Sequence, residues 1–357
     1  MQPPNRQASK SAGALTPGSP LAMAPLAVTM GEPAGIGPDI TLAAWRQRAT
    51  LNLPPFVVLG CAGTLRARAR QLVLDVDVAS VGTLREGTAL FARALPVLSI
   101  ATLPAVQPGT PNPETAHATI AAIETAVDLV KQGEASAIVT NPIAKSVLYA
   151  AGFRHPGHTE FLAELAQRHW GTPVLPVMMI ASDLLRVVPL TIHVPLAEVP
   201  GRLTAQLLID TVRVTAAGLA RDFGLHKPRI AVAGLNPHAG EGGTIGTEDQ
   251  RIIVPAIAAL QAEGLAVTGP HPADTLFHPA ARARYDVVIG MYHDQVLVPA
   301  KTLAFDTGVN VTLGLPFVRT SPDHGTAFDI AGTGRASPQS LIAALHMAQR
   351  MVEHRRR

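Results

Sequence analysis

Short apolar runs alternate with longer amphipathic segments along most of this chain, and that alternation limits the possible folds more than any other feature. Runs such as Phe56–Gly60 and Ala137–Thr140 have the length and composition of buried strands. Between these two runs, the segment Glu114–Gln132 places Ile123 and Val127 on one face of an expected helix. Strands that alternate with helices are typical of an α/β fold with a mostly parallel sheet.

The same alternation continues over the rest of the chain. Further strands are expected at Leu26–Met30, Val177–Ala181, Val187–Ile192, Ile230–Leu235, Val287–Gly290 and Val309–Leu313. Further helices are expected at about Leu203–Asp222 and Ser337–His354. The chain has 357 residues, which is enough for two domains.

Composition and charge narrow the class of protein. Hydrophobic residues make up 47% of the chain, yet no run reaches the roughly 18 apolar residues of a membrane helix. The net charge of +3 comes partly from Arg355–Arg357, and no basic stripe with interleaved aromatic residues indicates a nucleic-acid partner. The single cysteine, Cys61, excludes an internal disulfide and a cysteine-based zinc site, and it fits a cytoplasmic protein. Residues 1–24, rich in Pro, Ser and Gly, are predicted to be a disordered leader.

Polar and charged residues directly follow several of the expected strands. These residues are Glu32, Asn141, Lys145, His193, Asn236, His238 and His293. In open parallel sheets, ligands bind beyond the carboxyl ends of the strands. We therefore expect a functional site at this edge of the sheet.

Three of these residues are histidines in unusual settings. His193 ends a strand, whereas His238 and His293 lie beside glycines and carboxylates in Asn236–Gly243 and Met291–Gln295. Neutral imidazole binds divalent metal ions, but the spacing matches no His-Glu-x-x-His signature. The pattern alone leaves both metal ligands and ordinary packed or solvated histidines open.

Two further features point to an anion. Thr159, in His158–Glu160 before an apolar helix, reads either as a helix cap or as part of an anion site, because the free N–H groups of a helix start bind anions. Arg319 follows the apolar run Leu313–Val318, where a charge needs a carboxylate partner or a bound phosphate. The glycine-rich segment Gly31–Pro38 lacks the Gly-Lys-Ser/Thr ending of a P-loop, which leaves two interpretations open: a loop that binds a ligand in another way, or a plain strand-to-helix turn.

Seven long motifs, in this order along the chain, resemble those of the 4-hydroxythreonine-4-phosphate dehydrogenase family. They are Gly31–Asp39, Thr140–Lys145, Gly157–Glu160, Leu235–Gly243, Pro272–Phe277, Met291–Gln295 and Asn310–Thr320. The resemblance runs from about Leu26 to the C-terminal helix. Glu32 and Asp39 stand where the family usually has Asp and Glu, and both exchanges keep the charge.

The resemblance implies a fold like that of isocitrate and isopropylmalate dehydrogenases, with two α/β domains, mostly parallel sheets and a cleft between them. Residues 25–145 and 290–357 would form the first domain, with a cofactor loop in its C-terminal part. Residues 146–289 would form the second domain, which supplies dimerisation and metal ligands. The resemblance also implies a homodimer whose active site takes residues from both subunits.

The resemblance further assigns roles to individual residues. The implied metal ligands are His193, His238 and His293. The implied contacts with a small phosphorylated substrate are His158, Thr159, Lys301, Asn310 and Arg319. The metal would be a divalent ion, namely zinc, magnesium, cobalt or manganese.

A cofactor loop is implied in the same way. In the related dehydrogenases a His-Gly-Ser/Thr-Ala loop wraps the adenosine of the cofactor, and the segment His324–Gly334 is similar. The implied cofactor-binding residues are His324, Gly325, Thr326, Ala327 and Asp329. Asp329 at the ribose would favour NAD over NADP, because its charge would repel a 2′-phosphate.

The implied reaction is oxidation of 4-phosphooxy-L-threonine (4-hydroxythreonine 4-phosphate) at C3 by NAD. The β-keto acid formed then loses carbon dioxide to give 3-amino-2-oxopropyl phosphate, a step of pyridoxal 5′-phosphate biosynthesis. A divalent ion would lower the pKa of the hydroxyl and polarise the carbonyl. Lys145 and Asp294 are the candidates for the base that takes the hydroxyl proton.

Three alternatives stay open. A paralogue within the family would oxidise 4-phosphothreonate, 4-phosphoerythronate or a carboxylated cyclohexadiene diol. An acyltransferase that uses phosphate would share a related fold but would not need three metal-binding histidines. A metal-binding protein without catalysis would leave the adenosine-type loop unexplained.

Overall fold

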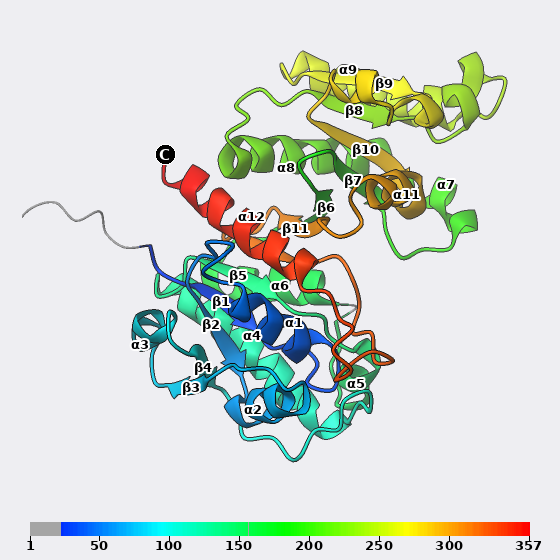
Figure 1. The fold of residues 1–357 in the computed structure, drawn as a ribbon. Helices are drawn as coiled ribbons and strands as arrows, with labels where there is room; N and C mark the ends of the chain where they lie inside the picture. Colours follow the sequence, from blue (N-terminus) through cyan, green and yellow to red (C-terminus); the bar gives the residue numbers. More distant parts are fainter. Residues whose placement is uncertain (1–22, 156) are drawn as a thin grey trace, which may run out of the picture.

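Within residues 23–155 and 157–357, which the computed structural model describes, twelve strands form one continuous sheet (Figure 1). The strands are β1 (Leu26–Thr29), β2 (Phe56–Gly60), β3 (Val78–Val81), β4 (Leu95–Ser99), β5 (Ala137–Thr140), β6 (Val177–Ala181), β7 (Arg186–Thr191), β8 (Ile230–Ala233), β9 (Val267–His271), β10 (Val287–Tyr292), β11 (Val309–Leu313) and β12 (Arg319–Pro322). Their order across the sheet is β3-β4-β2-β1-β5-β12-β11-β6-β7-β10-β8-β9.

The sheet is mostly parallel, as predicted. β11 pairs antiparallel with β6 and β12, β6 pairs antiparallel with β7, and the other pairings are parallel. The resemblance implied a separate sheet in each of two domains, but the strands form a single sheet. The two sets of strands are joined by β12, which pairs with β5 on one side and with β11 on the other. The boundaries given above for two domains stay a prediction.

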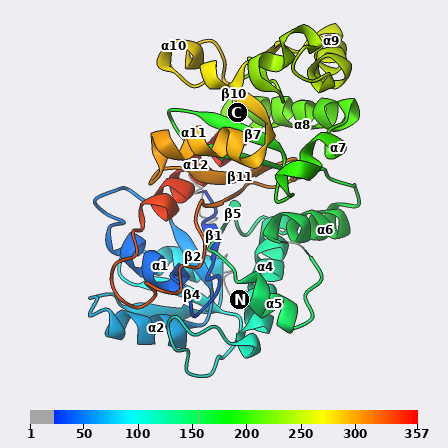
Figure 2. The ribbon, with the colours of Figure 1, turned by 90° about the vertical axis from the view of Figure 1, so that its right-hand side faces the viewer.

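Helices cover both faces of this sheet. They are α1 (Gly37–Arg46), α2 (Ala62–Gln71), α3 (Leu84–Leu90), α4 (Ala116–Lys131), α5 (Lys145–Ala150), α6 (His158–Trp170), α7 (Val199–Arg202), α8 (Ala205–Phe223), α9 (Val254–Ala262), α10 (Pro279–Arg282), α11 (His293–Ala304) and α12 (Gln339–Arg355). Figure 2 shows strands β1, β2 and β4 between α1 and α2 on one side and α4 and α5 on the other. The long helices expected from periodicity are confirmed as α4, α8 and α12.

Most of the strands inside the sheet are buried on both faces, which explains their nearly continuous apolar sequences, whereas the edge strands β3 and β9 are partly exposed. In β10, Val287 and Ile289 belong to the same apolar cluster as Leu208 of α8. Val288 between them points to the other face and packs in a cluster with Val296 of α11. Alternate residues of one strand thus hold α8 and α11 on opposite sides of the sheet.

The C-terminal helix α12 packs both on strands near the middle of the sheet and on helix α8. These strands are β12 and β5 (Figure 1). The carboxylate of Asp222, which is 1% exposed at the end of α8, accepts hydrogen bonds from Arg355 Nε at 2.6 Å and from Arg221 Nε at 2.7 Å. Burial alone would raise the pKa of Asp222, but the hydrogen bonds from the two guanidinium groups outweigh it and lower that pKa.

No helix in the described part of the chain is both long and apolar enough to cross a membrane. Of the predicted leader, residues 1–22 lie outside the described residues.

Asp222→Asn should lower the free energy of unfolding by about 2 kcal/mol near neutral pH, because it removes the buried carboxylate that pairs with Arg355, 18% exposed, and with the more exposed Arg221. The pKa of Asp222 is lower in the folded state than in the unfolded state. The stabilising contribution of the ionised Asp222 is therefore complete when the pH lies above the pKa of the unfolded state. It is lost as the pH falls through the folded pKa, and the difference between wild type and variant should shrink below about pH 4. Urea unfolding at several pH values measures both effects.

Asp183→Asn is the matched control, because Asp183 is 95% exposed and its contact with Arg350 is 3.8 Å long. An Asp222→Asn protein as stable as the control would contradict the role given to this ion pair.

Candidate active site

A pocket of about 340 Å³ lies at the middle of the sheet, where β12 joins the strands β3-β4-β2-β1-β5 to the strands β11-β6-β7-β10-β8-β9. Its lining side chains come from the carboxyl ends of β5 and β7, from β11, β12 and the loop after β12, from the first turns of α5 and α6, and from one face of α11. The predicted site residues that line it are Lys145, His158, Thr159, His193, His293, Lys301, Asn310, Arg319, His324 and Gly325. Residues from well-separated segments of the sequence therefore converge here, as expected for an edge where parallel strands end.

The guanidinium of Arg319 forms one wall of the pocket and is 3% exposed. Its Nη2 donates to Thr140 Oγ1 at 2.7 Å, and its Nη1 donates to Thr312 Oγ1 at 2.9 Å. These threonines lie on β5 and β11, the two strands that flank β12. Both neighbours thus supply neutral hydroxyl acceptors to the guanidinium.

The charge of Arg319 has no carboxylate to neutralise it at close range. Among the described residues, no Asp or Glu forms an ion pair with Arg319, and Glu160 acts on it only at longer range. Burial lowers the pKa of Arg319 to about 10, so the group is still charged at neutral pH. A buried cation of this kind requires an anion, and the pocket is where that anion would bind.

Four residues that line the pocket carry a buried polar atom without a hydrogen-bond partner, namely Asn141, His158, Asn310 and His324. His158 Nε2 and Asn310 Oδ1 are buried, yet neither has a hydrogen-bond partner. Burial lowers the pKa of His158 well below its usual value, and the positive charges of Arg319 and Lys145 lower it further, so His158 is neutral. Buried polar atoms normally have partners, and a bound ligand would supply them here.

His158 is also the first residue of α6, which begins after Gly157. The free N–H groups at the start of a helix attract anions. The start of α6, His158 and Arg319 therefore all present donors or positive charge to the same pocket.

The two lysines of the site differ in their surroundings. Lys301 Nζ forms an ion pair with Asp323 Oδ2 at 3.0 Å and also donates to the Asp323 carbonyl oxygen at 3.1 Å. Lys145 is the first residue of α5 and lies beside Gly157, where its charge reaches both His158 and His193.

His193 and His293 lie together, with ring centroids 5.8 Å apart. Partial burial lowers the pKa of His193, and the charges of Lys145 and His293 add to this, which keeps its imidazole neutral and able to bind a metal. His293 Nδ1 is 2.6 Å from Asp294 Oδ1, so its Nε2 is left for a ligand. Asp294 does not line the pocket itself.

His238 does not join the other two histidines in this chain. It is exposed, lies in the 3-10 segment Pro237–Gly243 after β8, and does not line the pocket. From His238 to Gly242 every residue has a positive φ, a costly conformation outside glycine. Within residues 23–155 and 157–357 of one chain, no group of three metal-binding side chains is formed.

The predicted cofactor loop reaches the pocket with one end. His324 and Gly325 line it, whereas Thr326, Ala327 and Asp329 do not. Asp329 is exposed, and its carbonyl oxygen accepts a hydrogen bond from Arg335 Nη2 at 3.3 Å.

Comparison with known proteins identifies the family. The family model described as pyridoxal phosphate biosynthetic protein PdxA matches residues 52–348. The chain belongs to the PdxA family. The 4-hydroxythreonine-4-phosphate dehydrogenase of Xanthobacter autotrophicus is 59% identical over 333 residues, which are 93% of this chain and 95% of the relative.

Solved structures of similar proteins agree with this family. A 4-hydroxythreonine-4-phosphate dehydrogenase from Klebsiella pneumoniae has a TM-score of 0.80 and 38% identity, over 92% of this chain and 99% of that one. A terephthalate 1,2-cis-dihydrodiol dehydrogenase from Burkholderia xenovorans has a TM-score of 0.59 and 30% identity, over 90% and 96% of the two chains.

Some residues of this PdxA-family site were not singled out from the sequence. Thr140 and Thr312 lie inside recognised motifs, but nothing in the sequence indicates that both accept hydrogen bonds from Arg319. Asp323, the partner of Lys301, was also not predicted. Its position directly before the predicted cofactor loop is the one sequence feature that indicates a role in the site.

Arg319→Met should weaken the binding of inorganic phosphate by about 30-fold or more, because charge-assisted hydrogen bonds contribute roughly 2–3 kcal/mol. Titration calorimetry of this PdxA-family protein with phosphate measures the change. Arg213→Met is the control, since Arg213 is an exposed residue that pairs with Glu263. Unchanged phosphate binding in Arg319→Met would show that the anion site lies elsewhere.

Proposed function

We propose that this chain catalyses the NAD-dependent oxidation of 4-hydroxythreonine 4-phosphate at C3, followed by decarboxylation to 3-amino-2-oxopropyl phosphate, in pyridoxal 5′-phosphate biosynthesis. The observation that carries the proposal is the buried, unneutralised Arg319 in a pocket next to two histidines. Such a pocket suits a substrate with a phosphate at one end and metal-binding groups at the other.

Phosphate binding is the first task of the pocket. Arg319 would bind the phosphate dianion, with the start of α6 and the unpaired Nε2 of His158 as donors completing its contacts. The unpaired Oδ1 of Asn310 can only accept, so it would fix the substrate through one of the substrate's own hydrogen-bond donors. Lys301, already positioned by Asp323, would add a second positive charge. Fixing the phosphate in this way orients C3 relative to the histidines.

Lys145 is the better placed of the two candidate bases. It lines the pocket, and its charge reaches His158 and His193, whereas Asp294 lies outside the pocket against His293. We propose that Lys145 Nζ, after giving up its own proton to become the neutral amine, takes the proton of the C3 hydroxyl and that Asp294 orients His293.

The donor set fits a divalent metal ion of the zinc, cobalt, manganese or magnesium type. His193 and His293 would hold the ion from one chain, and His238 of the partner subunit would complete the set. When bound, such an ion would lower the pKa of the hydroxyl and polarise the carbonyl of the oxidised substrate. NAD would accept the hydride, with its adenosine end at the loop that begins at His324.

An apolar surface beside the histidines supports a homodimer. Leu196, 68% exposed, lines a second cavity together with His193 and His293. A third cavity shares Tyr292 with the second, and its lining includes Val298, which is 62% exposed. Exposed apolar patches of this kind are typical of subunit interfaces.

The purified protein should reduce NAD when given 4-hydroxythreonine 4-phosphate. It should turn over 4-phosphothreonate, 4-phosphoerythronate and a carboxylated cyclohexadiene diol far more slowly. Absorbance of the reduced cofactor measures the rate, and mass spectrometry of 3-amino-2-oxopropyl phosphate verifies the product. A clear preference for one of the other substrates would reassign the chain to a paralogous activity.

The same assay tests the metal and the cofactor. Metal-stripped protein should be inactive and should regain activity when zinc, cobalt, manganese or magnesium is added. NADP should be the poorer cofactor, because Asp329 would repel its 2′-phosphate. Equal use of NADP would overturn the role given to Asp329.

Subunit exchange tests the shared site. His193→Ala and His238→Ala homodimers should each be inactive, and mixing them should restore roughly a quarter of wild-type activity. About half of the dimers are then mixed, and each mixed dimer holds one site with all its histidines intact. The matched control mixes His193→Ala with His293→Ala, which lie in the same chain and should not complement. Recovery of activity in the mixture of His193→Ala with His293→Ala, or no recovery in the mixture of His193→Ala with His238→Ala, would contradict a site shared between subunits in this way.

A further inference from the structure

The glycine-rich loop after β1 packs against the loop that follows β12. Ile36 N donates to Thr326 O at 3.0 Å. The backbones are so close that a Cβ at Gly35 would lie 2.9 Å from Thr326 O, so only glycine fits there. The loop after β1 thus supports the start of the predicted cofactor segment. The proposed reaction gives this loop no other role.

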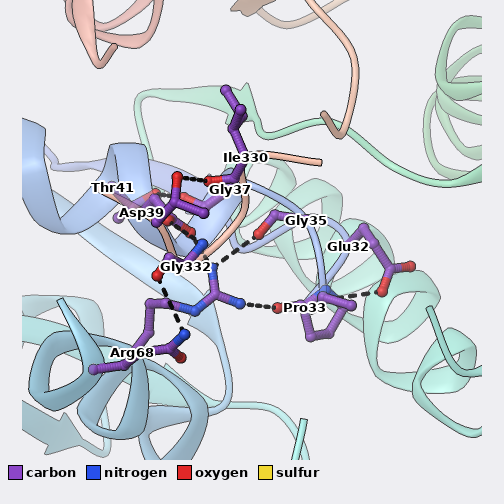
Figure 3. A network of polar contacts seen from close by, with 12 residues as sticks. Glu32, Pro33, Gly35, Gly37, Asp39, Thr41, Arg68, Ile330 and Gly332 are labelled. Carbon is purple, nitrogen blue, oxygen red and sulfur yellow. Dashed lines mark hydrogen bonds and ion pairs between the residues drawn. The ribbon is translucent and has the colours of Figure 1, made fainter. Parts of the chain in front are cut away.

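A buried arginine from α2 fixes the loop after β1 (Figure 3). Arg68, 2% exposed, donates through Nη1 to Gly35 O at 3.0 Å and through Nη2 to Pro33 O at 3.1 Å. The same guanidinium forms an ion pair with Asp39 in the first turn of α1. Arg68 therefore joins α2, α1 and the glycine-rich loop.

The other oxygen of Asp39 reaches the far end of the cofactor segment. Asp39 Oδ1 accepts a hydrogen bond from Gly332 N at 2.7 Å (Figure 3). In addition, Gln71 Nε2 of α2 donates to Gly332 O at 3.2 Å. Both backbone polar groups of Gly332 are thereby held by side chains of α1 and α2. Burial raises the pKa of Asp39, and the charge of Arg68 opposes that shift.

Residues 326–332 are consequently anchored at both ends, at Thr326 by the glycine-rich loop and at Gly332 by Asp39 and Gln71. Between the anchors, Asp329 is exposed and Ala327 has a φ of 41°. A left-handed alanine persists only where the surrounding structure holds it. The anchored segment is the part of the chain expected to contact the adenosine of NAD.

We propose that Arg68 and Asp39 are positioning residues for the cofactor: they hold residues 326–332 in the conformation that binds NAD. This inference rests on the proposed function, because it takes that segment as the cofactor loop. A segment that is already ordered loses less conformational entropy when the cofactor binds, so the ion pair raises affinity without touching the ligand.

Arg68→Met tests the proposal, with Arg70→Met as the matched control, since Arg70 is an exposed residue of the same helix. The Arg68 variant should bind NAD roughly tenfold more weakly by calorimetry, because its loop must order on binding. Hydrogen exchange should become faster in residues 326–332, while the affinity for inorganic phosphate stays unchanged. The control should match wild type in all three measurements.

Gln71→Leu is a milder variant that leaves the buried ion pair intact and removes only the bond to Gly332 O. It keeps the test decisive if Arg68→Met does not fold, and it should show the same changes to a smaller degree. Unchanged exchange in residues 326–332, or faster exchange with unchanged NAD affinity, would overturn the positioning role. A wild-type protein that does not bind NAD would instead overturn the proposed cofactor.

Discussion

A guanidinium group without a carboxylate partner lies at the join between the two halves of the sheet. Arg319 is carried there by β12, which pairs with β5 on one side and β11 on the other. Each neighbouring strand provides one threonine hydroxyl to orient the guanidinium, and neither provides a negative charge. The pairing that completes the sheet therefore also creates the anion site, and the free energy spent on burying the charge is recovered only when an anion binds.

The sequence predicted strands whose apolar runs are unbroken, because such runs are typical of strands buried on both faces. β2, β5, β6 and β11 lie where they were expected. β12 was not predicted, since the residues Arg-Thr-Ser-Pro have no strand-like pattern and become a strand only between two others. β9 was also missed, because this edge strand contains Gly269 and Pro270, two residue types that are depleted in strands.

The site was predictable to a similar degree. The placement of His193 and His293 after strands indicated a shared edge, and the structure brings them together. The roles of individual residues came from the family resemblance. The acceptors of Arg319 depend on strand register, and the interaction of Asp39 with Gly332 joins residues 293 positions apart. No local pattern encodes contacts of either kind.

The late position of β12 and α12 in the sequence affects how the chain folds during synthesis. β1 to β5 are translated first, but β12 must pair beside β5 and α12 must pack on β12 and β5. Until β12 and α12 have left the ribosome, the edge of β5 that pairs with β12 is open and the face that α12 covers is exposed. Open strand edges and exposed apolar surfaces promote association with other chains, so a nascent chain of this topology is prone to such association until α12 has emerged.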